Sequence, residues 1–183
     1  NAYGTLASGG IKREPYFIER IERLENDEWI SIYEHSEDDR YLPQRILTES
    51  VSCWATDALW ANVRQGTGVR AGWPMGSQPA AGKTGTTENF EDAWFVGYTP
   101  YLSTAVWMGN PNEKISMRGI YPYGNVTGGS FPAEVWGAFN EKYHANLPIR
   151  TFPYCNPFPQ RGEYLRTPDD PEAGTNPCPG QIT

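Results

Sequence analysis

The residues best suited to chemistry lie in one short segment, Ala-Gly-Lys-Thr-Gly-Thr-Thr, near the middle of the 183-residue chain. The segment predicts a β-strand, and side chains alternate between the two faces of a strand. Thr84 and Thr86 are therefore expected on one face, and Lys83, Gly85 and Thr87 on the other. Two hydroxyl groups in register can hydrogen-bond a carboxylate, and a nearby ammonium attracts it. The segment is therefore suited to bind a carboxylate group.

Two further features of this strand fit acyl chemistry. Gly85 has no side chain, so another element that carries a nucleophile can approach the strand closely. A free backbone N–H on the strand can donate to the oxyanion of a tetrahedral intermediate. The acidic residues Glu88, Glu91 and Asp92 are interpreted as a polar turn and not as an acid–base pair. Taken alone, Lys83 is equally well explained as a solvated lysine of an edge strand.

The tripeptide Gly-Lys-Thr also invites a phosphate-loop interpretation, which its surroundings exclude. Such a loop requires glycine at position 77, where this chain has serine, and Gly76 leaves the spacing one residue too long. A phosphate loop also follows a buried strand and opens a helix. Here a polar loop precedes the motif and strands are expected after it, so we reject nucleotide binding.

The elements expected after the motif form an antiparallel sheet with a helix. Strands are predicted at 80–87, 93–99 and 103–110, and their short connections require antiparallel neighbours. Four aromatic or β-branched residues then recur at every fourth position and predict a helix laid on the sheet. Strands followed by a helix indicate an α+β fold, an antiparallel sheet flanked by helices. The four repeated residues are Phe131, Val135, Phe139 and Tyr143.

Upstream of the motif, the hydrophobic pattern predicts two helices, a hairpin and a loop. Gly9-Gly10 is expected to end the shorter helix, and Thr48 to cap the longer one at its N-terminus. The expected bounds are a helix at 1–8, hairpin strands at 15–24 and 29–34, a helix at 48–65 and a Gly-rich loop at 66–78.

Several segments around the Lys-Thr-Gly motif occur in a recognisable order. The motif is followed by Asp-Ala-Trp-Phe-Val-Gly-Tyr-Thr-Pro at 92–100 and by Ala-Val-Trp-Met-Gly-Asn at 105–110. Gly-Thr-Gly at 66–68, Gly-Gly-Ser-Phe-Pro-Ala at 128–133 and Ala-Tyr-Gly-Thr-Leu-Ala-Ser-Gly-Gly at 2–10 complete the set. Together they closely resemble the transpeptidase domain of class A (bifunctional) penicillin-binding proteins. The resemblance runs without interruption to about Leu147.

This resemblance implies part of a penicillin-binding-protein or serine β-lactamase-like transpeptidase fold. It also implies a D,D-transpeptidase, which cleaves the D-Ala-D-Ala terminus of a peptidoglycan stem peptide through an acyl-serine. β-Lactams are expected to acylate this enzyme. By position, Lys83 would complete the cluster of catalytic groups, and the N–H of Thr86 would be one oxyanion donor. The residues expected to contact the substrate are Thr84, Gly85, Thr86 and Thr87. The hydroxyls of Thr84 and Thr86 are expected to bind its carboxylate.

Two motifs of the family have no counterpart in this sequence. No serine is followed three residues later by lysine, and no Ser-x-Asn tripeptide occurs. In the family both motifs precede the segment that matches 1–10, so we expect a fragment whose missing N-terminal part carries the nucleophile. The isolated chain is expected to be inactive. Two interpretations stay open beside this one: a D,D-carboxypeptidase or β-lactamase relative, and a non-catalytic penicillin-binding-like scaffold module.

Composition and charge limit the partners. The net charge is −7 and the charges are dispersed, with no basic run that could follow a phosphate backbone, so no nucleic acid is expected. Apolar stretches are shorter than the ~20 residues that cross a bilayer, so a membrane anchor is expected outside this chain. The two histidines, His35 and His144, lack ligand spacing, and neither a metal nor another cofactor is expected.

The cysteines divide between a helical pattern and a Pro-rich tail. Cys155 and Cys178 lie in the segment 148–183, which we expect to be an extended tail after the domain at 1–147. A disulfide between Cys155 and Cys178 is expected to stabilise this tail. Cys53 is expected to be a buried free thiol, and three unpaired thiols are the alternative. A disulfide would place the protein outside the cytoplasm, which agrees with the extracytoplasmic face of the bacterial cell membrane.

Overall fold

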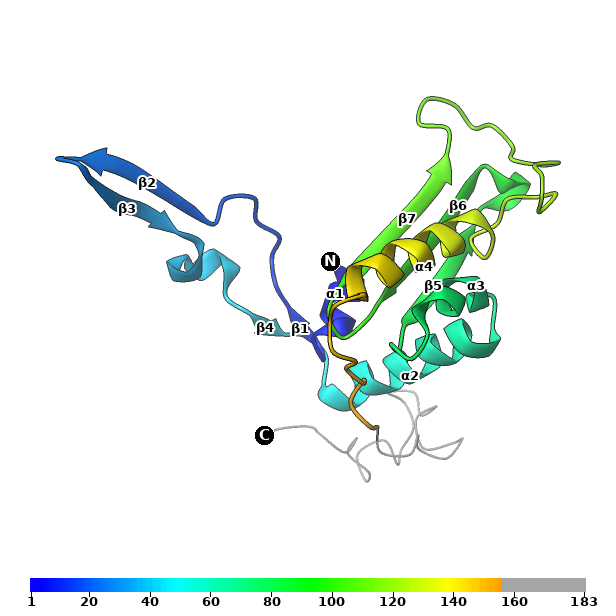
Figure 1. Ribbon diagram of the computed structural model, residues 1–183, viewed down its shortest axis with the longest axis horizontal. Coiled ribbons are helices and arrows are strands. Elements are labelled where there is room, and N and C mark those ends of the chain that lie inside the picture. The colour runs from blue at the N-terminus through cyan, green and yellow to red at the C-terminus, as the bar shows by residue number, and fades with distance from the viewer. Residues whose placement is uncertain (156–183) are drawn as a thin grey trace, which may run out of the picture.

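A computed structural model describes residues 1–155 and has a three-stranded antiparallel sheet at its centre (Figure 1). The strands β5 (Ala81–Thr86), β6 (Asp92–Tyr98) and β7 (Ser103–Gly109) pair in that order. In the described part of the chain, β5 therefore has one neighbour and one free edge. The three strands predicted from the sequence and the α+β class are confirmed.

One face of the sheet is covered by α4 (Phe131–His144), which lies across β6 and β7 (Figure 1). Trp136 is fully buried there, and its ring centre lies 5.3 Å from that of Phe95 on β6. The indole N–H of Trp136 donates to the backbone carbonyl of Thr104 on β7 at 3.0 Å. A large aromatic side chain that also satisfies its polar atom fixes the helix on the sheet.

The face of α4 that packs on the sheet is not the one that the four-residue repeat predicts. Val135, Phe139 and Tyr143 are about half exposed, whereas Trp136 and Gly137 are buried. Small residues decide the orientation, because a Cβ atom on Gly137 would lie 2.8 Å from the carbonyl oxygen of Ala71. The helix was predicted correctly, and its buried stripe was wrong.

The free edge of β5 is flanked by α2 (Glu49–Gln65), the longest helix in the described residues. Its first turn is capped as predicted, because the hydroxyl of Thr48 accepts from the N–H of Val51 at 3.3 Å. Inside the core, the hydroxyls of Thr56 on α2 and Tyr98 on β6 share a hydrogen bond of 2.7 Å. Burial raises the pKa of Tyr98 to about 12.

The segment after α2 is more regular than the predicted Gly-rich loop. It forms α3 (Val69–Gly72) and a 3-10 turn, Trp73–Met75, before β5 begins. Both pack against α4, and Ala71 and Met75 are buried. The glycines therefore permit close approach of short helical turns and do not mark an irregular loop.

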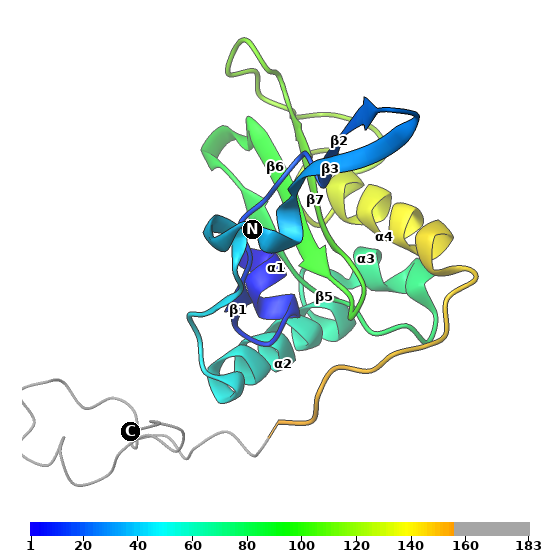
Figure 2. The same cartoon turned by 90° about the vertical axis from the view of Figure 1, so that its left-hand side faces the viewer.

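A hairpin of β2 (Arg20–Glu25) and β3 (Glu28–Glu34) projects from the rest of the molecule (Figures 1 and 2). The predicted hairpin is confirmed, although its first strand begins at Arg20 and not at residue 15. Its two-residue turn places Asn26 and Asp27 at positive φ, as tight hairpins require. Its apolar side chains are exposed, with Trp29 at 67%.

The remaining short elements connect these parts. No helix of the described residues is both long and apolar enough to cross a membrane. The remaining bounds are α1 (Ala2–Ala7), β1 (Ile11–Lys12) paired with β4 (Gln44–Arg45), and the 3-10 turns His35–Glu37, Asp39–Tyr41 and Glu88–Phe90.

After α4 the chain runs back across the body to the start of α2 (Figure 2). We call residues 148–155 the strap; it contains no helix or strand, as expected for an extended segment. Gln78 donates to the carbonyl of Arg150 at 2.9 Å, and the ring of Phe152 lies 5.7 Å from that of Tyr98. The strap is therefore packed on the domain, while a domain boundary at residue 147 stays a prediction.

The disulfide joins Cys53 to Cys155, with Cα atoms 5.6 Å apart. The predicted Cys155–Cys178 pair and the predicted free thiol at Cys53 are both wrong. The physical reason is the path of the strap, which brings Cys155 to α2 although 102 positions separate the two cysteines. Cys178 lies outside the described residues.

Candidate functional site

The free edge of β5 directs alternate backbone groups away from the sheet. The N–H of Thr87 donates to the carbonyl of Asp92 at 3.0 Å, which continues the ladder as a hydrogen-bonded pair. Such pairs alternate with non-hydrogen-bonded pairs along an antiparallel ladder. Thr84 and Thr86 occupy non-hydrogen-bonded positions, so their N–H and C=O groups point to the free edge. An oxyanion donor at Thr86 needs this orientation.

The C-terminal end of α2 closes one end of this edge. The amide nitrogen of Asn62 donates to the carbonyl of Gly82 at 2.8 Å, and its amide oxygen accepts from both the N–H and the hydroxyl of Thr67 at 3.1 Å. A Cβ atom on Gly66 or Gly68 would lie 2.4 or 2.8 Å from the Asn62 side chain. The Gly-Thr-Gly segment therefore wraps tightly around Asn62 and is held to β5 through it.

Three side chains meet where the edge opens to solvent. The hydroxyls of Thr67 and Thr84 are 2.7 Å apart. Lys83 donates to the carbonyl of Thr84 at 2.9 Å and lies 3.4 Å from its hydroxyl. Lys83 starts from the opposite face, as alternation requires, but its long side chain reaches around the edge. An exposed ammonium and two hydroxyls thus gather at one point, which is a suitable arrangement for an anion.

The loop before α4 packs directly on the backbone of β5. The N–H of Gly128 donates to the hydroxyl of Thr86 at 3.0 Å. A Cβ atom on Gly128 would lie 2.1 Å from the carbonyl oxygen of Trp94 and 2.8 Å from the nitrogen of Gly85. At Gly85 itself, a Cβ atom would have Trp94 Cβ at 3.4 Å as its nearest neighbour among the described residues. The close approach of the loop before α4 to the backbone of β5 therefore depends on Gly128.

Thr87 differs from the other predicted site residues. Its hydroxyl accepts from the N–H of Asp92 at 2.8 Å and stabilises the turn between β5 and β6. The structure thus brings Lys83, Thr84 and Thr86 to one edge and gives the hydroxyl of Thr87 a partner in the turn. Its contact with a substrate stays a prediction.

A polar cluster beside the site was not predicted from the sequence. Arg70 forms an ion pair with Glu134 at 3.3 Å and lies 4.7 Å from the ring centre of Tyr123. The hydroxyl of Tyr123 donates to Glu134, and this bond is the main cause that raises the pKa of Tyr123. A cavity of about 480 Å³ lies here, bordered by Arg70, Tyr123 and Gly129. Helix α3, the 3-10 turn Glu88–Phe90 and the loop before α4 form it, and they are far apart in sequence, so no local pattern signals it.

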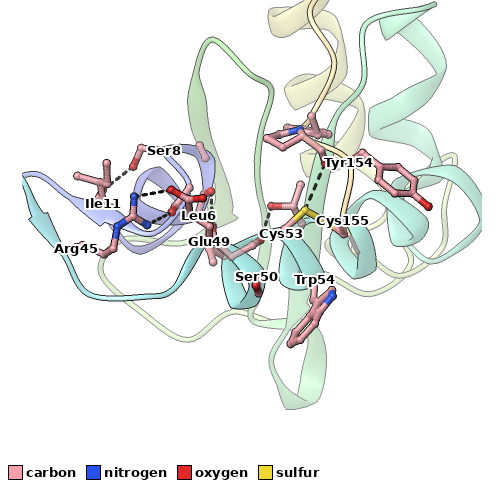
Figure 3. Close-up of a pocket in the computed structure, with 16 residues that line it drawn as sticks. Leu6, Ser8, Ile11, Arg45, Glu49, Ser50, Cys53, Trp54, Tyr154 and Cys155 are labelled. Carbon is pink, nitrogen blue, oxygen red and sulfur yellow. Dashed lines mark hydrogen bonds and ion pairs between the residues drawn. A yellow bond between two sulfur atoms is a disulfide. The ribbon is translucent and has the colours of Figure 1, made fainter. Parts of the chain in front are cut away.

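A second cavity, of about 610 Å³, lies away from β5, between α1, α2 and the strap (Figure 3). The Cys53–Cys155 disulfide forms one wall. On the opposite side, Arg45 donates to Glu49 at 3.1 Å and to the carbonyl of Gly9 at 2.9 Å. Since these charged groups are already paired, we interpret the cavity as the seam between the strap and the domain.

The α+β fold with Lys-Thr-Gly on an edge strand places the chain in the class of penicillin-binding proteins and their relatives. More narrowly, residues 1–119 match the family described as the penicillin binding protein transpeptidase domain. The chain belongs to this family.

Relatives and solved structures agree with this assignment. The chain is 30% identical over 201 residues to penicillin-binding protein 1A of Mycolicibacterium smegmatis, covering 99% of this chain and 23% of that protein. It is 38% identical to penicillin-binding protein 1A of Aquifex aeolicus, over 62% of this chain and 14% of that one. The chain therefore spans less than a quarter of either relative.

Among solved structures, the penicillin-binding protein PonA1 from Mycobacterium tuberculosis superposes with a TM-score of 0.66 at 26% identity, over 85% of this chain and 40% of that one. PonA1 in complex with penicillin V gives 0.65, with the same identity and coverage. Penicillin-binding protein 1A from Haemophilus influenzae, at 19% identity and a TM-score of 0.65, supports the fold alone, over 84% of this chain and 27% of that one.

Proposed function

We propose that this chain is part of a peptidoglycan D,D-transpeptidase, which cross-links stem peptides by serine acyl transfer and is acylated by penicillin. Membership of the transpeptidase family supports this, as does similarity to a protein solved with penicillin V. The observation that carries the proposal is the edge of β5, where the ammonium of Lys83 meets the hydroxyl of Thr84 beside the outward-pointing N–H of Thr86.

The proposed reaction has two acyl transfers. A serine oxygen attacks the carbonyl of the penultimate D-Ala, the peptide bond breaks, and the terminal D-Ala leaves with the proton that the serine gives up. An amine of a neighbouring strand then attacks the acyl-serine, and the serine regains a proton as the new amide forms. With penicillin, the same attack opens the lactam ring and the product stays attached.

Each residue of the β5 edge has a defined part in this proposal. The N–H of Thr86 donates to the carbonyl oxygen as negative charge develops on it. The hydroxyls of Thr84 and Thr86 and the ammonium of Lys83 hold the terminal carboxylate. Lys83 also supplies positive charge to the group of residues that activates the serine. Gly85 and Thr87 are proposed to border the peptide.

The nucleophile is proposed to come from another segment of the same protein. The sequence has no serine followed three residues later by lysine, so the Lys-Thr-Gly strand is this chain's contribution. The chain alone is therefore proposed to be inactive. Removing one partner from a site whose members act together abolishes nearly all of its catalysis.

The proposed location is the extracytoplasmic face of the bacterial cell membrane. Disulfides persist outside the cytoplasm, and the Cys53–Cys155 bond agrees with this. The proposed partners are stem peptides that end in D-Ala-D-Ala, β-lactams and the N-terminal part of the same protein. A membrane anchor is proposed to lie outside these 183 residues.

Labelling with a fluorescent penicillin tests the proposal. The complete protein should become covalently fluorescent, and excess unlabelled penicillin should prevent it. The 183-residue chain alone should stay unlabelled. A complete protein that binds stem peptide without ever being labelled would support the non-catalytic scaffold instead. Rapid release of hydrolysed penicillin would support a β-lactamase relative.

A further inference from the structure

We propose that Thr67, on the loop after α2, is a positioning residue that sets the direction of the Thr84 hydroxyl for a ligand carboxylate. The inference rests on the proposed function and extends it to a residue outside the Lys-Thr-Gly strand. It starts from three hydrogen bonds that join Asn62, Thr67 and Thr84.

The orientation of Asn62 fixes the first step. Its amide nitrogen must face the carbonyl of Gly82, 2.8 Å away, because a carbonyl only accepts. The amide oxygen of Asn62 therefore faces Thr67. It accepts from both the N–H and the hydroxyl of Thr67, each at 3.1 Å. The single hydroxyl proton of Thr67 thus points to Asn62.

The direction of the next bond follows from this. Since Thr67 has used its proton, its oxygen must accept in the 2.7 Å contact with Thr84. The oxygen of Thr84 is left to accept from Lys83, whose ammonium lies 3.4 Å away. Without a ligand, the donors run in one direction, from Lys83 through Thr84 and Thr67 to Asn62. Hydrogen bonds aligned in this way polarise one another.

A carboxylate at the edge reverses two of these hydroxyls by rotation alone. Thr84 turns its proton to the carboxylate, and its oxygen then accepts from Thr67. Asn62 keeps the N–H of Thr67 as a donor, so no polar atom of this group loses its last partner. Thr67 is exposed and Thr84 half-buried, so a ligand has access to this pair.

The variant Thr67→Val tests the inference, because valine keeps the shape and removes the hydroxyl. The complete protein should be acylated about tenfold more slowly by penicillin, the cost of a hydrogen bond that supports a charged group. Penicillin methyl ester has no carboxylate for the Thr84 hydroxyl to bind. Its rate of acylation should therefore change less than about twofold in the variant. Intact-mass measurement of the acyl-enzyme gives both rates.

Two further variants separate positioning from folding. Thr67→Ser keeps the hydroxyl and should restore the rate with penicillin. Thr104→Val removes a buried hydroxyl that has no hydrogen-bond partner among the described residues, and should leave both rates unchanged. If Thr67→Val does not fold, Thr67→Ala is measured against Thr67→Ser in its place.

The outcomes distinguish this inference from the proposed function. An equal loss of rate with penicillin and with its methyl ester would overturn the positioning role of Thr67, and so would an unchanged rate with penicillin. Failure of the unmodified complete protein to form any acyl-enzyme would instead overturn the proposed function.

Discussion

At the scale of single residues, glycine at position 128 controls how closely the loop before α4 lies on β5. A Cβ atom there would lie within 3 Å of three backbone atoms of Trp94 and Gly85. Backbone atoms in a paired ladder cannot move aside as a flexible side-chain end can. The hydroxyl of Thr86 also depends on this approach, because it accepts from the N–H of Gly128.

We predict that Gly128→Ala destabilises the protein and impairs the site together. Overpacking of this kind costs about 1–3 kcal/mol, and the loop should withdraw from Thr86. Thermal unfolding and penicillin labelling of the complete protein measure the two effects. The control is Gly4→Ala in α1, where a Cβ atom would meet nothing within 4 Å. Normal stability of Gly128→Ala would contradict the tight contact.

The local Lys-Thr-Gly motif was sufficient to single out Lys83, Thr84 and Thr86. Alternation puts the two threonines on one face of β5, and the long side chain of Lys83 reaches around the free edge to Thr84. The motif was not sufficient to predict the contacts that hold these residues in place. Thr67 was matched as part of a motif, but its contact with Thr84 joins positions 17 apart across the end of a helix. The contact of Arg70 with Glu134 spans a still longer stretch of chain. Such pairs depend on the path of the loops, which periodicity does not encode.

At the scale of elements, α4 shows how a clear repeat can mislead. Spacing at every fourth residue predicts the helix correctly, because the pattern needs only local geometry. Which face is buried depends on what the neighbouring elements allow. Gly137 and Ala133 let α4 approach α3 and the sheet, and Trp136 then fills the core. The larger residues of the repeat are left on the outer face.

Two substitutions in α4 test this assignment of its faces. Trp136→Ala should cost about 3–5 kcal/mol, because a fully buried indole and its hydrogen bond are lost. Phe139→Ala should cost less than about 1 kcal/mol, since that residue is 50% exposed. Denaturant unfolding measures both. The reverse order of costs would show that the four-residue repeat is the buried stripe after all.

At the scale of the whole molecule, the strap ties the end of the described chain to α2. The disulfide links α2 to the segment after α4, so the closed loop contains all three strands of the central sheet. Hydrogen bonds of Gln78 with Arg150, and of Tyr101 with the carbonyl of Pro148, hold the strap along its path. The sequence could not predict this pairing, because only the tertiary path brings Cys155 to Cys53.

Removing the disulfide should lower stability and leave the site intact. Closing a loop of about 100 residues stabilises a protein by up to about 4.7 kcal/mol through the unfolded chain. We expect Cys53→Ser to unfold at a lower temperature but to keep penicillin labelling in the complete protein, because in the described residues no hydrogen bond, ion pair or ring contact joins Lys83, Thr84 or Thr86 to the strap. Peptide mapping without reduction should recover Cys53 joined to Cys155. A peptide that joins Cys155 to Cys178 would contradict the structure.

The most direct test of the account is the rate of covalent penicillin labelling in the complete protein with Lys83→Ala. Loss of one preorganised charge from such a site slows acylation by about 100-fold or more, and we predict a loss of that size. The matched control is Lys142→Ala, which removes an exposed lysine from α4 and should label normally. If Lys83→Ala is labelled as fast as the unmodified protein, the ammonium of Lys83 takes no part in acyl transfer and the account of this site is wrong.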